Sequence, residues 1–270
     1  MRNILVCGNG PSCTKIDFTR VPDDVKIMRA TSFYFEDKYY AGKRVDYYVD
    51  YMKRIVNQYF VVRTVHDKGE YDIDLANTWW TVMHEKNPHF PAAKSCTDYI
   101  QQNIYIAEFR CFYEYYYGQY LPTGMQALAL AFCLGYENIY VAGFDMFTDP
   151  NNMHPFPYGG KVMQAALESV PSTGIYDTSE VKSENKSEFE YVQVLRPTDM
   201  QVKFVQLLQK CFPKTKIMSV VENSIMNQHV TVAPIIHDVP WYVPQKKPTD
   251  RTTDWYPLPE SMPSRRRNTQ

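Results

Sequence analysis

The chain has 270 residues and a formal net charge of −1, which allows one domain with a sizeable core and argues against a dedicated nucleic-acid binder. Its six cysteines are scattered without Cys-x-x-Cys spacing, which excludes a disulfide framework or zinc site and fits a reducing compartment. We find no signal-like segment at the N-terminus and no apolar run long enough to span a bilayer. We therefore expect a soluble, cytoplasmic protein without a transmembrane segment.

The first informative segment is an apolar run over residues 4–7 that ends in a glycine-rich turn. The turn consists of Gly8, Asn9, Gly10, Pro11 and Ser12. Glycine lets a backbone approach a ligand closely, and N–H groups of such a loop favour negative charge. The natural occupant is a nucleotide phosphate, although a plain strand-turn without a ligand fits the same pattern. The third glycine of a dinucleotide fingerprint is missing, which disfavours NAD.

Apolar runs with strand character alternate with helical stretches along most of the chain. The predicted strands cover residues 4–7, 25–28, 45–49, 139–142 and 216–221, and the predicted helices cover residues 96–117, 123–134 and 198–211. Thr123 is the expected N-cap of the second helix and Gly135 its expected stop. This alternation predicts an α/β fold with a mostly parallel, Rossmann-like sheet and helices on both faces. Ligands of such sheets bind at the carboxyl ends of the strands.

Two regions interrupt this pattern. Residues 148–190 have no clear periodicity and are typical of a lid or a disordered insertion, whereas residues 239–270 are rich in proline and predict an extended tail. We expect one domain over residues 1–238, with a tail that wraps along it or contributes to a homo-oligomer contact. Asp72-Ile73-Asp74 is interpreted as a solvated turn, and the histidines show no metal-ligand spacing.

Several segments together resemble the bacterial sialyltransferases of glycosyltransferase family 42, known from Campylobacter lipooligosaccharide synthesis. Their order and spacing match the family over about residues 1–235, and the block Phe-Tyr-Phe-Glu-Asp-Lys-Tyr-Tyr at residues 33–40 is the most specific of them. The matching segments are residues 8–12, 16–17, 33–40, 42–43, 134–136, 139–140, 143 with 145, 198–199 and 223–224.

The resemblance implies a single-domain variant of the GT-A fold with a lid over the active site. It also implies CMP-sialic acid as the donor, inversion at the anomeric centre, a galactoside or sialoside acceptor and no metal or other cofactor. A donor with one phosphate needs no metal where hydroxyl and amide groups can neutralise it. The residues that the resemblance assigns to the donor site are Gly8, Asn9, Gly10, Ser12, Thr31, Thr123, Gly124, Gly143, Asp145, Asn223 and Ser224, with Asp145 near the ribose.

The chain departs from the family at positions that carry the chemistry. The position of the family's general-base histidine is occupied by Val194, which cannot accept a proton. Thr31 and Tyr51 replace two donor-contacting asparagines, Tyr120 replaces an arginine, and Phe147 replaces a tyrosine that assists departure of the phosphate. Loss of a general base alone slows a reaction by about 10²–10⁴-fold.

Three hypotheses follow from these departures. In the first, the chain is still a sialyltransferase, and other side chains take over the lost roles. In the second, it gives sialic acid to water as a sialidase or CMP-sialate hydrolase, with Tyr51, beside Asp50, or Tyr120 as a nucleophile. In the third, it is a non-catalytic relative that binds a ligand. The retained donor loop favours an enzyme. The candidates for the lost roles are His154, Tyr158, Lys161, Glu190, Tyr191 and Arg196.

Overall fold

One eight-stranded sheet forms the centre of the molecule, and every strand pairing in it is parallel. The computed structural model describes residues 2–31, 33–50, 62–81, 94–116, 121–146, 148 and 198–247. The strands run in the order β10-β9-β8-β1-β2-β4-β6-β7. Their bounds are β1 (Asn3–Cys7), β2 (Lys26–Ala30), β4 (Tyr47–Asp50), β6 (Thr78–Trp80), β7 (Lys94–Ser95), β8 (Asn138–Ala142), β9 (Lys216–Ser219) and β10 (Thr231–Val232).

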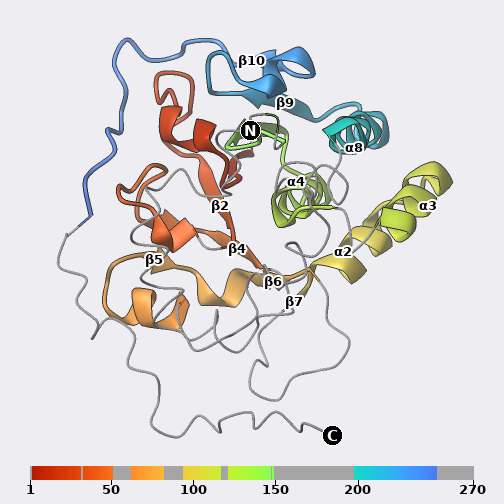
Figure 1. Cartoon of the computed structure of the whole chain (residues 1–270), viewed down its shortest axis with the longest axis horizontal. Coiled ribbons are helices and arrows are strands. Elements are labelled where there is room, and N and C mark those ends of the chain that lie inside the picture. The colour runs from red at the N-terminus through yellow and green to blue at the C-terminus, as the bar shows by residue number, and fades with distance from the viewer. Residues whose placement is uncertain are drawn as a thin grey trace, which may run out of the picture.

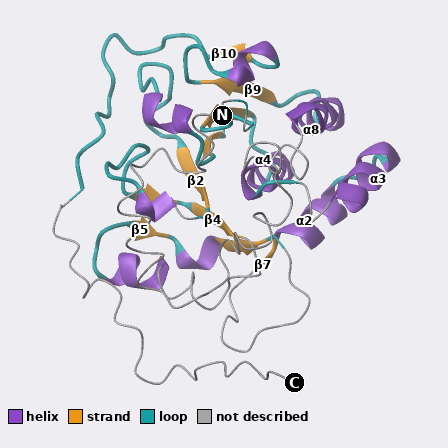
Figure 2. Ribbon diagram, viewed as in Figure 1, coloured by secondary structure: helices purple, strands orange, loops and turns teal. Residues whose placement is uncertain are grey.

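Four α-helices gather on one side of the sheet (Figure 1). They are α2 (Cys96–Asn103), α3 (Ala107–Tyr116), α4 (Thr123–Cys133) and α8 (Thr198–Cys211). The other side carries the helical residues 62–67, a small parallel pair of β3 (Arg44–Val45) with β5 (Asp72–Ile73), and short 3-10 helices. The segment that follows β10 runs as a long loop down this side to residue 247 (Figure 2).

Residues 4–7 of β1 are buried on both faces of the sheet, which explains why they are all apolar rather than alternating with polar residues. Ile4 and Val6 pack into the cluster that contains α4, whereas Leu5 and Cys7 pack into the cluster on the other face. α4 is the central helix of the first cluster, because its residues from Met125 to Phe132 are all buried. Each fully buried aliphatic side chain stabilises the fold by about 1.5–3 kcal/mol, so these two layers fix β1 in the middle of the sheet.

A buried ion pair ties the segment after β2 to the sheet. Arg29 and Glu36 are both 0% exposed, and their side chains lie 2.8 Å apart. The hydroxyl of Tyr71 also donates to Glu36, at 2.6 Å. Burial raises the pKa of Glu36, and the nearby charges of Arg29 and Lys247 oppose that rise. The pair therefore holds the 3-10 helix η2 (Phe33–Phe35) close to the end of β2.

The described part of the C-terminal segment is anchored along the domain. The indole N–H of Trp241 donates to the carbonyl of Val21 at 2.6 Å. Lys247 is buried, pairs with Glu70 at 2.5 Å and donates to the carbonyl of Tyr34 at 2.7 Å. The extended tail predicted for residues 239–270 thus wraps along the domain as far as residue 247.

Most predicted elements are confirmed, with four corrections. The predicted helix over residues 96–117 is two helices, separated at residues 104–106. Thr123 is the first residue of α4, and Pro122 holds the N-cap position. Asp72-Ile73-Asp74 is no simple turn, because its first two residues pair with β3 and Asp74 caps the 3-10 helix η4 (Leu75–Asn77). The strands β6, β7 and β10 were not predicted, because each has only two or three residues.

None of the helices in the described part of the chain combines the length and the apolar character that crossing a bilayer requires.

We predict that Lys247→Met lowers the free energy of unfolding by about 3 kcal/mol, because the nearly buried carboxylate of Glu70 then loses its ion pair with the ammonium group. The measurement is urea unfolding followed by circular dichroism. Lys246→Met is the matched control, since Lys246 is exposed and its change should be close to neutral. Equal stability of the two variants would show that the Lys247 anchor contributes nothing.

Candidate functional site

The order in which the chain adds strands reverses at β1. From β1 the chain adds β2, β4, β6 and β7 on one side, and it then returns to add β8, β9 and β10 on the other. β1 and β8 pair with Cys7 opposite Ala142, so the segments that leave their carboxyl ends start side by side. In open α/β sheets, ligands bind in the crevice outside such a switch point.

Two glycines let these segments touch. A Cβ atom on Gly8 would lie 2.3 Å from the carbonyl oxygen of Gly143, and one on Gly143 would lie 2.3 Å from that of Gly8. Gly143 also has a φ of +73°, in the left-handed region that side chains disfavour. The N–H of Gly10 donates to the carbonyl of Gly143 at 2.9 Å. The close approach of the two loops therefore requires glycine at both positions.

Ser12 and Asp145 join the same two loops through side chains. The backbone N–H and the hydroxyl of Ser12 both donate to Oδ2 of Asp145, at 3.0 and 2.9 Å. The hydroxyl oxygen of Ser12 accepts the N–H of Gly143 at 3.0 Å. Burial raises the pKa of Asp145, and the two bonds from Ser12 oppose the rise. Oδ1 of Asp145 takes part in neither bond, so it is able to accept a hydrogen bond from a ligand hydroxyl.

The amino end of α4 lies against this crevice. A Cβ atom on Gly124 would lie 3.7 Å from the Cα of Gly8 and 3.5 Å from the ring of Phe144. α4 begins at Thr123, one residue earlier, and the first N–H groups of a helix have no carbonyl partner within it. These groups and the helix dipole give the corner a positive partial charge, which suits an anion.

The third wall of the crevice comes from the ends of β2 and β4. The amide nitrogen of Asn9 donates to the carbonyls of Ala30, at 3.3 Å, and Thr31. Its Oδ1 is buried and has no hydrogen-bond partner among the described residues, so a ligand donor could satisfy it. The hydroxyl of Thr31 donates to Asp50 at 2.9 Å, and the hydroxyl of Tyr48 donates to the same carboxylate.

Asp50 is the site residue that sequence reasoning missed. It is fully buried, it ends β4 at the same edge of the sheet as Gly8, and it fixes the hydroxyl of Thr31. The sequence contains a signal for this role, because Asp50 is a carboxylate at the end of an apolar strand. Burying such a group costs free energy unless it is hydrogen-bonded or paired. In the sequence it stands out only as the neighbour of Tyr51.

Asn223 and Ser224 lie at the same edge, beyond the end of β9. Asn223 has a φ of +58°, a conformation that asparagine adopts more readily than most residues. Ser224 is the N-cap of the 3-10 helix η6 (Ile225–Gln228), and its hydroxyl accepts the N–H of Met226 at 3.3 Å. The structure therefore gives Ser224 a local capping role.

Every donor-site residue that the sequence nominated belongs to the described part of the chain, and those that follow β1, β2 and β8 or begin α4 meet at the carboxyl ends of the strands. The catalytic candidates and departures named from the sequence lie outside the described residues: Tyr51, Tyr120, Phe147, His154, Tyr158, Lys161, Glu190, Tyr191, Val194 and Arg196. Among the described residues there is no group of three or more His, Cys, Asp or Glu side chains that could hold a metal ion.

The chain matches one protein family over almost its whole length. Residues 2–266 match the family model described as CST-I, alpha-2,3-sialyltransferase. The chain therefore belongs to the CST-I alpha-2,3-sialyltransferase family, which is a family of glycosyltransferase enzymes. No curated protein matches the chain.

Solved structures show the same fold. The chain is 24% identical to the sialyltransferase CstII from Campylobacter jejuni in complex with the substrate analogue CMP-3FNeuAc, with a TM-score of 0.73 and 92% of both chains covered. It is also 24% identical to the monofunctional alpha-2,3-sialyltransferase Cst-I from Campylobacter jejuni, with a TM-score of 0.71 over 97% of this chain and 90% of that one. CST-II in complex with a trisaccharide acceptor and CMP has a TM-score of 0.66 at 23% identity, over 92% of both chains. The predicted GT-A-like α/β fold is thereby confirmed.

We predict that Ser12→Ala lowers the free energy of unfolding by about 1–3 kcal/mol, because it leaves the buried N–H of Gly143 without its acceptor. Thermal unfolding measured by calorimetry tests this. Thr14→Ala removes a hydroxyl from the same short helix, where Thr14 bonds only to the carbonyl of Pro11 at 2.9 Å, and should change stability by about 0.5 kcal/mol or less. A Ser12→Ala protein as stable as Thr14→Ala would contradict the role of Ser12 as a brace between the loops.

Proposed function

We propose that the chain transfers sialic acid from CMP-sialic acid to a galactoside or sialoside acceptor, without a metal. The observation that carries this proposal is the meeting of the glycine loop, Asp145 and the amino end of α4 at the switch point. It offers donors for one phosphate and a carboxylate oxygen for a sugar hydroxyl. The relatives described as complexes with CMP and CMP-3FNeuAc support the choice of donor.

The described residues divide the work of donor binding. The first turn of α4, with Thr123 and Gly124, would hold the phosphate together with the backbone N–H of Asn9. The N–H groups of Gly8 and Gly10 already donate to the carbonyls of Ala142 and Gly143. Asp145 would accept a hydrogen bond from the ribose through Oδ1, while Ser12 keeps Oδ2 occupied. The positive partial charge of the helix end would also stabilise the CMP that leaves, because it acts where negative charge develops.

Proton transfer from the acceptor is assigned to a side chain other than Val194. A positioned base must lie within hydrogen-bond reach of the acceptor hydroxyl and exchange a proton near working pH. Among the sequence candidates for the lost roles, His154 and Glu190 can accept a proton near that pH, whereas Arg196 stays protonated and would serve a negatively charged group instead. We further propose that the segment over residues 148–190, which holds two of these candidates, serves as the lid of the site.

Acceptor dependence tests the function directly. Incubation of the chain with CMP-sialic acid should release CMP about tenfold faster, or more, when lactose or 3′-sialyllactose is added, because an oriented acceptor hydroxyl competes effectively with water. Product formation is followed by NMR, with Gly10→Ala as the inactive control. CMP and free sialic acid released at one rate with or without acceptor would contradict transfer and favour the hydrolase.

A second prediction concerns the missing histidine. Val194→His should raise the acceptor-dependent kcat by about 10-fold or more and add a limb to the pH profile near pH 6.5, because it restores a group that can accept the proton. Val194→Asn is the matched control, since it is polar but cannot act as a base at that pH. Equal rates for the two variants would show that position 194 takes no part in proton transfer.

A further inference from the structure

A hollow lies beside β4, β6 and β7, to one side of the switch point. Its volume is about 540 Å³, within the range of small-ligand sites. Tyr47 and Lys94 line it from the first positions of β4 and β7, whereas the glycine loop follows the last position of β1. Through the register of β1, β2 and β4, Tyr47 stands level with Val6, so β2 separates the two sites across the sheet rather than along its strands. The lining residues are Tyr47, Asn77, Trp79, Lys94, Ser95, Asp98, Tyr99, Gln102 and Leu134.

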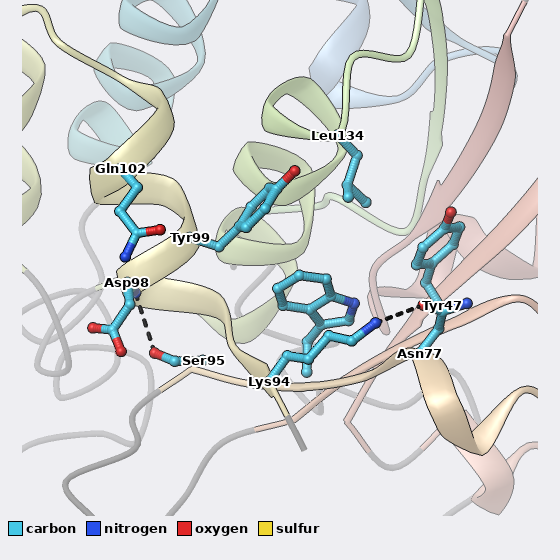
Figure 3. A pocket seen from close by; sticks show the side chains of 9 residues that line it. Tyr47, Asn77, Lys94, Ser95, Asp98, Tyr99, Gln102 and Leu134 are labelled. Atoms are coloured by element: carbon cyan, nitrogen blue, oxygen red, sulfur yellow. Dashed lines mark hydrogen bonds between the residues drawn. The ribbon is translucent and has the colours of Figure 1, made fainter. Parts of the chain in front are cut away.

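Aromatic and polar side chains share the walls of this hollow. Figure 3 shows Tyr99 and Tyr47 on opposite sides of it, with Lys94 between them and Asp98 and Gln102 along one side of α2. The ring of Tyr99 meets that of Trp79 edge to face, with centroids 5.1 Å apart. This contact holds the two rings together on one wall of the hollow, which is open to solvent.

Three polar groups at the hollow can each form a further hydrogen bond or ion pair. The indole Nε1 of Trp79 is buried in a residue that is 4% exposed, and it has no acceptor among the described residues. The ammonium of Lys94 lies 5.2 Å from the centre of the Trp79 ring and donates to Asn77 at 3.1 Å, which leaves it further donor capacity. Asp98 has no cationic partner in the described ranges. A ligand that displaces Lys94 from the indole would gain a donor and a cation together.

The charges limit what can bind. A polyphosphate would meet only one lysine at the hollow and would be repelled by Asp98, and a purely apolar ligand would strip water from Lys94 and Gln102 without replacing it. A sugar ring suits both kinds of wall, because its C–H face packs on tyrosine rings while its hydroxyls bond to amide and carboxylate groups. A single carboxylate on the sugar would pair with the ammonium group.

We propose that this hollow is a second saccharide-binding site, separate from the switch-point crevice, and that it takes a sugar with one carboxylate. Such a site would hold a glycan chain to the domain independently of the donor. The sugar class follows from the lining residues; only the choice of a sialylated probe rests on the proposed function.

Titration with 3′-sialyllactose tests the site through the indole NMR signal of Trp79, assigned with Trp79→Phe. The signal should shift saturably. Lys94→Ala should weaken binding about fivefold, as expected for one partly exposed charge pair, and lactose should bind the intact protein more weakly by a similar factor. Gln102→Ala, at an exposed position of α2, should also weaken it.

Two controls separate this site from the crevice. Lys214→Ala removes an exposed lysine before β9 and should leave the titration unchanged. Gly10→Ala disturbs the donor loop, because its Cβ would lie 2.0 Å from Oδ2 of Asp145, yet the Trp79 shift should persist. An unchanged Trp79 signal, or a shift that Lys94→Ala does not weaken, would overturn the inference. Neither result depends on whether CMP-sialic acid is turned over.

Discussion

The contact between two glycine loops at the switch point is the constraint on which the rest of the structure depends. Gly8 and Gly143 approach so closely that no side chain fits between them, and Ser12 and Asp145 bond across the same gap. Strand pairing sets the starting points of both loops, and α4 delivers its amino end beside them. One packing arrangement at the switch point thus joins the sheet, the central helix and the two loops.

The sequence was sufficient to predict the elements around this contact because their signals are local. Buried parallel strands are apolar runs, and a glycine with φ of +76° at Gly135 ends α4 as expected. The short strands at the far edge of the sheet were missed, since two or three residues have no periodicity and depend on pairing. Asp50 was missed for a related reason. Its role depends on hydrogen bonds with Thr31 and Tyr48, which only the folded chain brings together.

The proposed function divides donor binding and proton transfer between different parts of this chain. The residues proposed for the donor lie in the described part of the chain, whereas the substitutions that the family resemblance indicates fall on groups expected to move protons or assist the leaving group. A binding loop is fixed by backbone geometry and tolerates little change. A base can be supplied from any segment that reaches the acceptor. Under the proposed function, this difference would let the donor site be kept while Val194 occupies the position where the family resemblance places a histidine.

A crystal structure of the chain with CMP would test the central claim most directly. The account predicts the phosphate within hydrogen-bond distance of the first N–H groups of α4 or the loop from Gly8 to Gly10. It also predicts a ribose hydroxyl on Oδ1 of Asp145. A nucleotide bound away from the switch point, or a crevice left empty at saturating CMP, would contradict it.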